Sequence, residues 1–228
     1  IVTILKQFII KKYSFCLEKK LSSPTWKHEI INIGGVCDSY QPLEEKLQLM
    51  PEILKLMIDP YNNLYQIIFN ISDLDLINEL SKITYVNIAC TIITVDDKLR
   101  SIIEPGSSSI INRFRVIDQI KKHTNASTGI HIMPIIPYLT DHPGNINGLY
   151  KRKKVNADYV LPGILYLRGP TRSYFFNAIK KYDYHLYKKI SSLYYQKEEF
   201  NLYKKNLYSM INQIKKQYNI DTPTYPKQ

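Results

Sequence analysis

The sequence predicts an α/β fold in which parallel strands alternate with helices. Five short segments have strand character. Each is followed by a helix, or by a loop and then a helix. Several of these segments are nearly continuous apolar runs, which is typical of strands buried on both faces of a parallel sheet. Strands that alternate with helices imply right-handed parallel crossovers. Five such units do not close an eight-stranded barrel, so the sheet is open or partly closed, or units are missing.

The first part of the chain predicts a helix, a loop and a strand. Residues Ile1–Cys16 place apolar side chains on one side and lysines on the other, as in an amphipathic helix. The strand Glu29–Val36 ends at Gly34 and Gly35. Paired glycines allow a tight turn or the close approach of a ligand, and a plain bulge is the alternative.

A polar loop and a longer helix come next. Residues Asp38–Pro42 hold a carboxylate, a phenol and an amide before the predicted helix Leu43–Ile58. Proline suits the start of a helix, whereas Pro51 would distort the interior of this one. A strand at Tyr65–Phe69 and a helix at Asp73–Lys82 complete this part of the predicted fold.

The stretch from Tyr85 to Ile117 organises the rest of the chain. An apolar strand ends at the polar residue Thr91, a short helix and a turn follow, and Ser107–Ser109 caps the next helix. Arg113 lies one helical turn into that helix. Because ligands of α/β folds bind outside the carboxyl ends of the strands, both Thr91 and Arg113 are candidate site residues. For Arg113, a surface salt bridge to Glu104 or Asp118 is the alternative.

Two further strands and a helical end are predicted. Gly129–Ile136 is a strand whose His131 fits an interior or rim histidine better than a ligand. Ala157–Leu167 is the last strand, and Arg168 stands at its carboxyl end. From Tyr184 to Tyr218 the chain is helical and rich in Tyr and Lys. Such interleaving suits base stacking and phosphate binding, or amphipathic packing with extended lysines, which we favour.

Composition limits the class of protein. The net charge of +11 is typical of a protein with a nucleic acid, phosphate or acidic-surface partner, but the Ile, Lys, Asn and Tyr content also fits an AT-rich coding sequence. No apolar run approaches the roughly 20 residues of a membrane span. The cysteines Cys16, Cys37 and Cys90 match no disulfide or zinc pattern, so a cytoplasmic location is expected. A first residue Ile rather than Met favours a fragment.

Four segments together resemble one family. They are INIGGVCDSYQPLE, CTIITVDDKLRSIIEPGSSSIINRF, MPIIPYLTD and LYLRGP. These segments are similar to Gly-x-x-Thr-Asp-Pro-Tyr-Gln-Pro-x-Glu, to Ser-x-Thr-Thr with Glu-Pro-Gly-x-Pro and Arg-Leu, to Pro-Ile-Ile-Pro-Gly-x-x-Asp, and to Leu-Arg-Leu-Pro. The chain therefore resembles the radical S-adenosylmethionine superfamily, in its spore photoproduct lyase-like branch.

The resemblance implies a fold and a chemistry. The fold is an incomplete (β/α)6 partial barrel over residues 1–182 that lacks its first strand, with a C-terminal helical extension and tail over residues 183–228. The implied cofactors are S-adenosyl-L-methionine and a [4Fe-4S] cluster, with an electron donor such as flavodoxin or ferredoxin. The implied lyase-type reaction is reductive cleavage to a 5′-deoxyadenosyl radical, which abstracts hydrogen from an unknown substrate, with DNA or another macromolecule left open.

The resemblance also assigns roles to residues, which we group by ligand part. The residues implied in cofactor binding are Gly34, Gly35 and Asp38 at the methionine amino end, Thr91 and Arg113 at its carboxylate or ribose, and the backbone of Met133 and Ile135 beside the adenine. Tyr40 and Arg168 are implied on the substrate side. A guanidinium can hold a carboxylate in a bidentate fork.

The chain departs from the family at the cluster. It has no Cys-x-x-x-Cys-x-x-Cys, so this chain holds no expected metal ligand, and the resemblance places the first strand and the cluster loop upstream of Ile1. We expect this chain alone to be inactive. Two alternatives stay open: a catalytically inactive nucleic-acid-binding scaffold of the same fold, and an unrelated α/β barrel enzyme with a phosphate ligand at Gly34 and Gly35.

Overall fold

The computed structural model describes residues 15–26, 31–33, 43–58, 65–67, 73–153 and 157–219. The predicted site residues Gly34, Gly35, Asp38 and Tyr40 lie outside the described residues, as do Cys37 and most of the predicted first helix. Within the described part, residues 15–21 are helical.

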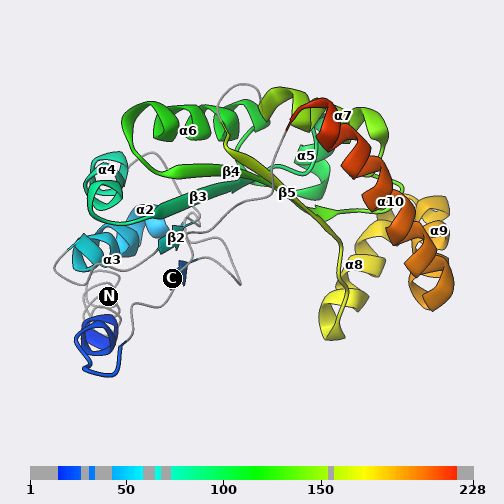
Figure 1. Ribbon diagram of the computed structural model, residues 1–228. Helices are drawn as coiled ribbons and strands as arrows, with labels where there is room; N and C mark the ends of the chain where they lie inside the picture. The colour runs from blue at the N-terminus through cyan, green and yellow to red at the C-terminus, as the bar shows by residue number, and fades with distance from the viewer. Residues whose placement is uncertain are drawn as a thin grey trace. The chain divides into compact units, whose positions relative to one another are not determined.

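The described residues contain five strands, as the sequence predicts, in one sheet of order β1-β2-β3-β4-β5. Their bounds are β1 Ile31–Ile33, β2 Tyr65–Ile67, β3 Val86–Thr91, β4 Ser127–Ile135 and β5 Tyr159–Ile164. Strands β1 and β2 pair in parallel, and so do β2 and β3, where Tyr65 lies opposite Val86. The predicted α/β class is confirmed (Figure 1), and closure into a partial barrel stays a prediction.

Helices follow the strands along the chain. Their bounds are α2 Glu44–Leu47, α3 Leu49–Ile58, α4 Leu74–Ile83, α5 Asp97–Ile103, α6 Ile110–His123, α7 Pro143–Lys153, α8 Gly169–Tyr182, α9 Tyr184–Tyr195 and α10 Lys197–Gln217. The single helix predicted over Leu43–Ile58 is interrupted at Gln48, whose φ is 52°. Pro51 thereby falls in the first turn of α3, where its missing N–H costs no hydrogen bond. None of the helices among the described residues combines the length and apolar character that crossing a membrane requires.

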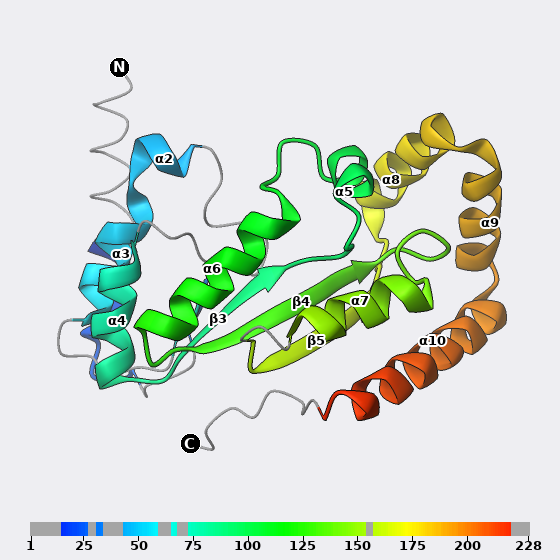
Figure 2. The same cartoon turned by 90° about the horizontal axis from the view of Figure 1, so that it is seen from above.

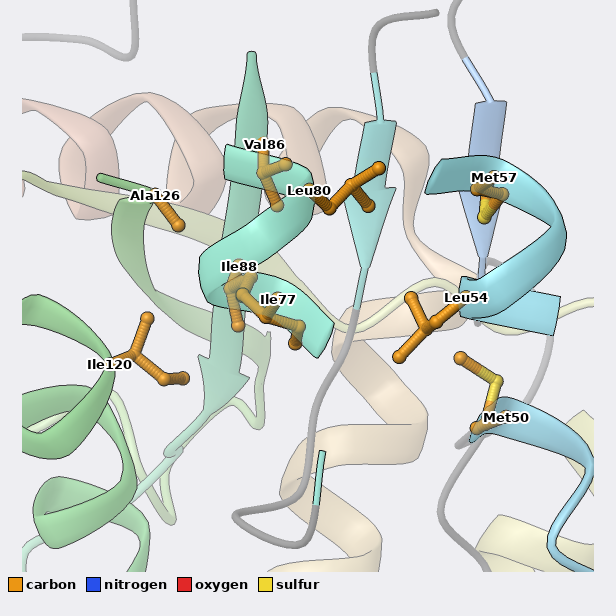
Figure 3. Close-up of a cluster of buried hydrophobic side chains, with 9 residues drawn as sticks. All are labelled: Met50, Leu54, Met57, Ile77, Leu80, Val86, Ile88, Ile120 and Ala126. Carbon is orange, nitrogen blue, oxygen red and sulfur yellow. The ribbon is translucent and has the colours of Figure 1, made fainter. Parts of the chain in front are cut away.

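The chain divides into two compact units. Unit 1 includes the described parts of residues 1–90 and 114–129, and unit 2 includes residues 91–113 and the described parts of 130–223. The core of unit 1 lies between α3, α4, α6 and β3 (Figure 3). Its side chains are almost all aliphatic or Met: Met50, Leu54, Met57, Ile77, Leu80, Val86, Ile88, Ile120 and Ala126.

The core of unit 2 lies just past the strand ends. Its buried members are Ile93, Ile136 and Leu167, which follow β3, β4 and β5, together with Phe176, Ile179 and Ile190 from α8 and α9. Helix α10 packs beside α7 and α9 (Figure 2). The residues after these strands therefore rest on an apolar base that helices α8 and α9 supply. The domain boundary predicted between residues 182 and 183 stays a prediction.

Candidate functional site

The end of β3 and the start of α6 bring two predicted site residues together. Arg113 Nη1 donates to the carbonyl oxygen of Thr91 at 2.7 Å, and Arg113 Nε donates to the carbonyl oxygen of Ser108 at 3.1 Å. The Arg113 side chain is only 11% exposed. Its guanidinium is therefore fixed at the carboxyl end of a central strand.

Glu104 supplies the counter-charge of this arginine. Its Oε2 lies 3.1 Å from Arg113 Nη1, and the two side chains are 24% and 11% exposed. The angles at this contact do not meet those of a hydrogen bond. The buried Oε2 of Glu104 therefore has no hydrogen-bond donor among the described residues. The contact is thus the salt bridge to Glu104 that was the alternative for Arg113, and it is half-buried instead of lying on the surface. Among the described residues, Arg113 Nη2 has no acceptor. A ligand carboxylate would therefore meet Nη2 alone, and not both arms of the bidentate fork that the sequence analysis expects.

A second arginine holds the loop between α5 and α6. Asp97 accepts from Arg100 Nε at 2.7 Å and from the backbone N–H of Ile110 at 3.0 Å, which caps α6. Arg100 Nη1 also donates to the carbonyl oxygen of Ser107 at 2.8 Å. The Arg100 hydrogen bond, followed by the Ile110 N–H, lowers the pKa of Asp97. The sequence analysis missed this brace, although Asp97 and Arg100 have the i, i+3 spacing of a helical ion pair.

Asn145 of α7 connects the loops that follow β3 and β4. Its Nδ2 donates to the carbonyl oxygens of Ile93 and Thr140 at 3.0 and 2.7 Å, and its Oδ1 accepts from Val95 N at 2.8 Å. One amide thus satisfies three backbone groups from two loops. No sequence signal distinguished this asparagine from those on exposed surfaces.

The carboxyl end of β4 contains the predicted adenine-side residues. Ile135 is fully buried, and its carbonyl oxygen accepts from Leu165 N at 2.9 Å. The Met133 side chain packs so closely on Gly163 that a Cβ there would lie 2.5 Å from Met133 Cγ. The contact of Met133 and Ile135 with adenine stays a prediction. Because Leu165 N already donates to the Ile135 carbonyl oxygen, an adenine donor would use the other lone pair of that oxygen.

Tyrosines of the last two helices form hydrogen bonds at and beyond the carboxyl ends of β4 and β5. The hydroxyl of Tyr203 donates to Asp141 Oδ2, and that of Tyr194 donates to the carbonyl oxygen of Leu165 at 2.5 Å. The Tyr208 hydroxyl accepts from Ile164 N at 3.4 Å. Burial raises the pKa of Tyr194, and burial with the Asp141 bond raises that of Tyr203. These tyrosines pack as the favoured amphipathic interpretation expects.

His131 and Arg168 occupy different surroundings. His131 is 7% exposed, and its Nε2 lies 3.4 Å from the Tyr159 hydroxyl, as expected of an interior histidine. Burial lowers the pKa of His131. Arg168 precedes α8, is exposed, and has its guanidinium 5.0 Å from the centre of the Tyr166 ring. Its predicted substrate role stays a prediction.

The described residues do not fit an iron–sulfur cluster. Cys16 is exposed on the first helical segment, whereas Cys90 is buried within β3. No group of three or more His, Cys, Asp or Glu side chains in the described part of the chain is gathered to hold a metal ion. A cluster with an open iron site needs three thiolates in one short loop. These cysteines do not supply them.

The chain is similar in sequence to known proteins of two bacteria. No family model matches the chain. Uncharacterized proteins of Mycobacterium bovis and Mycobacterium tuberculosis are 29% identical over 165 residues, which is 70% of this chain and 48% of each relative. The chain thus spans about half the length of the curated relatives it matches.

A solved structure shares the fold. It is a mutant spore photoproduct lyase with bound S-adenosylmethionine and a dinucleoside spore photoproduct, and it superimposes with a TM-score of 0.54 at 9% identity. The match covers 75% of this chain and 50% of that chain. At this identity the likeness shows the fold alone: the chain shares the α/β fold of this spore photoproduct lyase.

Proposed function

We propose that this chain is the part of a radical S-adenosylmethionine enzyme that binds the cofactor's methionine carboxylate at Arg113. The observation that carries the proposal is the fixed guanidinium at the end of β3, whose Nη1 holds Thr91 O at 2.7 Å while Nη2 has no acceptor among the described residues. The sequence motifs and the shared fold support it. In enzymes of this class, bound S-adenosylmethionine supplies a 5′-deoxyadenosyl radical after reductive cleavage.

The chain's own residues bind and orient the ligand. Two backbone carbonyls and Glu104 hold the Arg113 side chain in place, so little rotamer entropy is lost when Nη2 meets a carboxylate. The brace between Asp97 and Arg100 keeps the start of α6 in position. Hydrogen abstraction in the whole protein needs cluster ligands other than the cysteines of this sequence.

Binding of two related ligands tests this proposal. S-adenosylhomocysteine carries the amino acid end, whereas 5′-methylthioadenosine lacks it. Calorimetric titration of the protein is expected to show tighter binding of S-adenosylhomocysteine by about tenfold, which is typical of one charge-assisted hydrogen bond. Arg113→Lys, which loses the Thr91 and Ser108 anchors, is expected to bring the two affinities close together.

The matched control is Arg115→Lys, two residues along α6 on an exposed position. It keeps the overall charge and is expected to preserve the preference. Equal affinities for the two ligands in the wild-type protein contradict the carboxylate role. So does an unchanged preference in a folded Arg113→Lys variant.

A second candidate function, binding of a single-stranded nucleic acid such as DNA, rests on a different surface. Two exposed tyrosine rings of α9, Tyr184 and Tyr195, each lie beside a cation. Arg172 lies 4.5 Å from the centre of the Tyr195 ring, and Tyr195 is 72% exposed. Lys188 lies 4.9 Å from the Tyr184 ring. Exposed rings with nearby positive charge can stack on bases and hold phosphates.

Fluorescence anisotropy with a labelled oligothymidine tests this second function. Affinity is expected to fall steeply as salt rises, because phosphate binding releases counterions. Tyr195→Ala is expected to weaken binding about tenfold, in line with the loss of one base–aromatic stack. Leu202→Ala, at a 61% exposed position on α10, is the control. Binding that ignores salt, or that survives Tyr195→Ala unchanged, argues against nucleic acid.

A further inference from the structure

Tyr138, three residues beyond the end of β4, has an unusual backbone conformation. Its φ is 61°, in the left-handed region that favours glycine. A bulky side chain in this region costs free energy, and such outliers gather at binding sites. The family pattern similar to residues 133–141 has glycine at this position, so the tyrosine is a property of this chain.

The ring of Tyr138 is held on one side and open on the other. It lies 5.5 Å from the Tyr203 ring at 53°, a tilted arrangement that aromatic pairs favour. The Tyr203 hydroxyl donates to Asp141 Oδ2. Tyr138 nevertheless remains 45% exposed. Helix α10 thus fixes an exposed aromatic ring at the carboxyl end of a strand.

We propose that Tyr138 is a specificity-determining residue that stacks on the flat base of the adenosyl ligand. This inference rests on the proposed function, because it names the contact for the other end of the same ligand. A ring that is already fixed loses little entropy on stacking, which compensates for the unfavourable backbone conformation. Tyr203 is the positioning residue for this ring. Asn145 supports the same loop through the carbonyl oxygen of Thr140.

Titration with 5′-methylthioadenosine, which has the base but no carboxylate, tests the inference. Tyr138→Gly removes the ring and also the left-handed backbone penalty, so the variant is expected to fold. Its affinity for this ligand is expected to fall about tenfold, the effect of one lost base–aromatic stack. Tyr138→Phe keeps the ring and is expected to bind as wild type. Tyr182→Ala, 48% exposed on α8, is the matched control.

The outcomes separate this inference from the Arg113 proposal. The stack predicts equal losses for 5′-methylthioadenosine and S-adenosylhomocysteine in Tyr138→Gly, whereas Arg113→Lys affects only the carboxylate ligand. Affinity of Tyr138→Gly within twofold of wild type overturns the stack and leaves the carboxylate role standing. Equal affinities for the two ligands in wild type overturn the carboxylate role alone. A wild-type protein that binds neither ligand overturns both.

Discussion

Among the described residues, unit 1 and unit 2 bury similar aliphatic side chains but differ in where their side-chain hydrogen bonds lie. In unit 1, Glu44 of α2 accepts from Met50 N of α3, and Ser81 of α4 accepts from Asn125 N just before β4. In unit 1, the described core joins α3, α4 and β3 through residues such as Leu54 and Leu80, which are fully buried. In unit 2, the residues beyond the strand ends are also tied by directional bonds: Arg113 to Thr91, Asn145 to both loops, and Tyr203 to Asp141.

This difference teaches where a binding site can be built on such a chain. Hydrophobic contacts are roughly proportional to area and have no direction, so they stabilise helices on a sheet without fixing a polar group in space. Hydrogen bonds require distance and angle, so a network of them holds polar side chains in one geometry. The candidate site lies where hydrogen bonds tie the residues at the carboxyl ends of β3 and β4.

The largest expected effect comes from the unit 1 core. Leu80→Ala removes a fully buried side chain and leaves a cavity, so the free energy of unfolding is expected to fall by about 3 kcal/mol. Urea denaturation followed by circular dichroism measures it. The control Leu202→Ala, at a 61% exposed position, is expected to change stability by less than about 0.5 kcal/mol. Similar losses of unfolding free energy in the two variants would contradict the claim that burial of apolar side chains stabilises unit 1.

The next-largest effect tests the hydrogen bonds of Asn145 in unit 2. Asn145→Asp replaces the donor Nδ2 by an oxygen that faces the carbonyl oxygens of Ile93 and Thr140, 3.0 and 2.7 Å away. Repulsion and two lost bonds are expected to cost about 2–3 kcal/mol. Asn112→Asp, at an exposed position of α6, is the control and should be nearly neutral. Amide hydrogen exchange is expected to rise around Val95 if the loops loosen, and unchanged exchange there would contradict the bridging role.

Much of the fold follows from local sequence. Apolar runs with polar ends specify the strands, and the predicted strand at Gly129–Ile136 falls within two residues of the observed β4. Pro51 signalled a broken helix, but the break lies three residues earlier, because proline is accommodated in the first turn and Gln48 takes the left-handed turn. Local rules locate such breaks only to within a turn.

The candidate site was partly predictable. Thr91 and Arg113 were named because strand ends gather ligands, and the structure places their bond at 2.7 Å. Asn145 and Tyr203 were missed because decisive partners lie far away in sequence: the Asn145–Ile93 bond spans 52 residues, and the Tyr203–Asp141 bond spans 62. Pattern reasoning sees periodicity and spacing, whereas these bonds depend on how α7 and α10 pack.

The third effect sharpens the role of the tyrosine hydroxyls. Tyr203→Phe deletes the bond to the Asp141 carboxylate and is expected to cost about 2 kcal/mol near pH 7, typical of a hydrogen bond to a charged group. Burial and the Asp141 bond raise the pKa of Tyr203. A raised pKa contributes stability that is complete below the ordinary tyrosine pKa of about 10 and is lost as pH rises above it.

Chemical denaturation at pH 8 and pH 10.5 measures this difference. Wild type is expected to lose more stability than Tyr203→Phe between the two values, since phenylalanine does not titrate. Tyr174→Phe, at a 75% exposed position, is the control and should follow wild type. Parallel pH profiles of stability for wild type and Tyr203→Phe would show that the Tyr203–Asp141 hydrogen bond does not stabilise unit 2.

The smallest expected effect concerns His131, a buried group of unit 2 whose contact with the Tyr159 hydroxyl is long at 3.4 Å. Burial lowers the pKa of His131, so its neutral form is favoured in the folded protein. The unfolded chain therefore binds the proton first as pH falls below about 6.5, and stability declines from that point. Between pH 6.5 and 5.5 the decline in stability due to this residue is at most about 1.4 kcal/mol, the free energy of one pH unit.

His131→Gln is expected to flatten the pH profile of stability measured by thermal unfolding, whereas His185→Gln, at an exposed position of α9, should leave it unchanged. Because burial alone causes this shift, a steeper decline in His131→Gln than in wild type would show that a directional bond to the charged imidazole outweighs desolvation, and His131 would then belong with the polar network of unit 2.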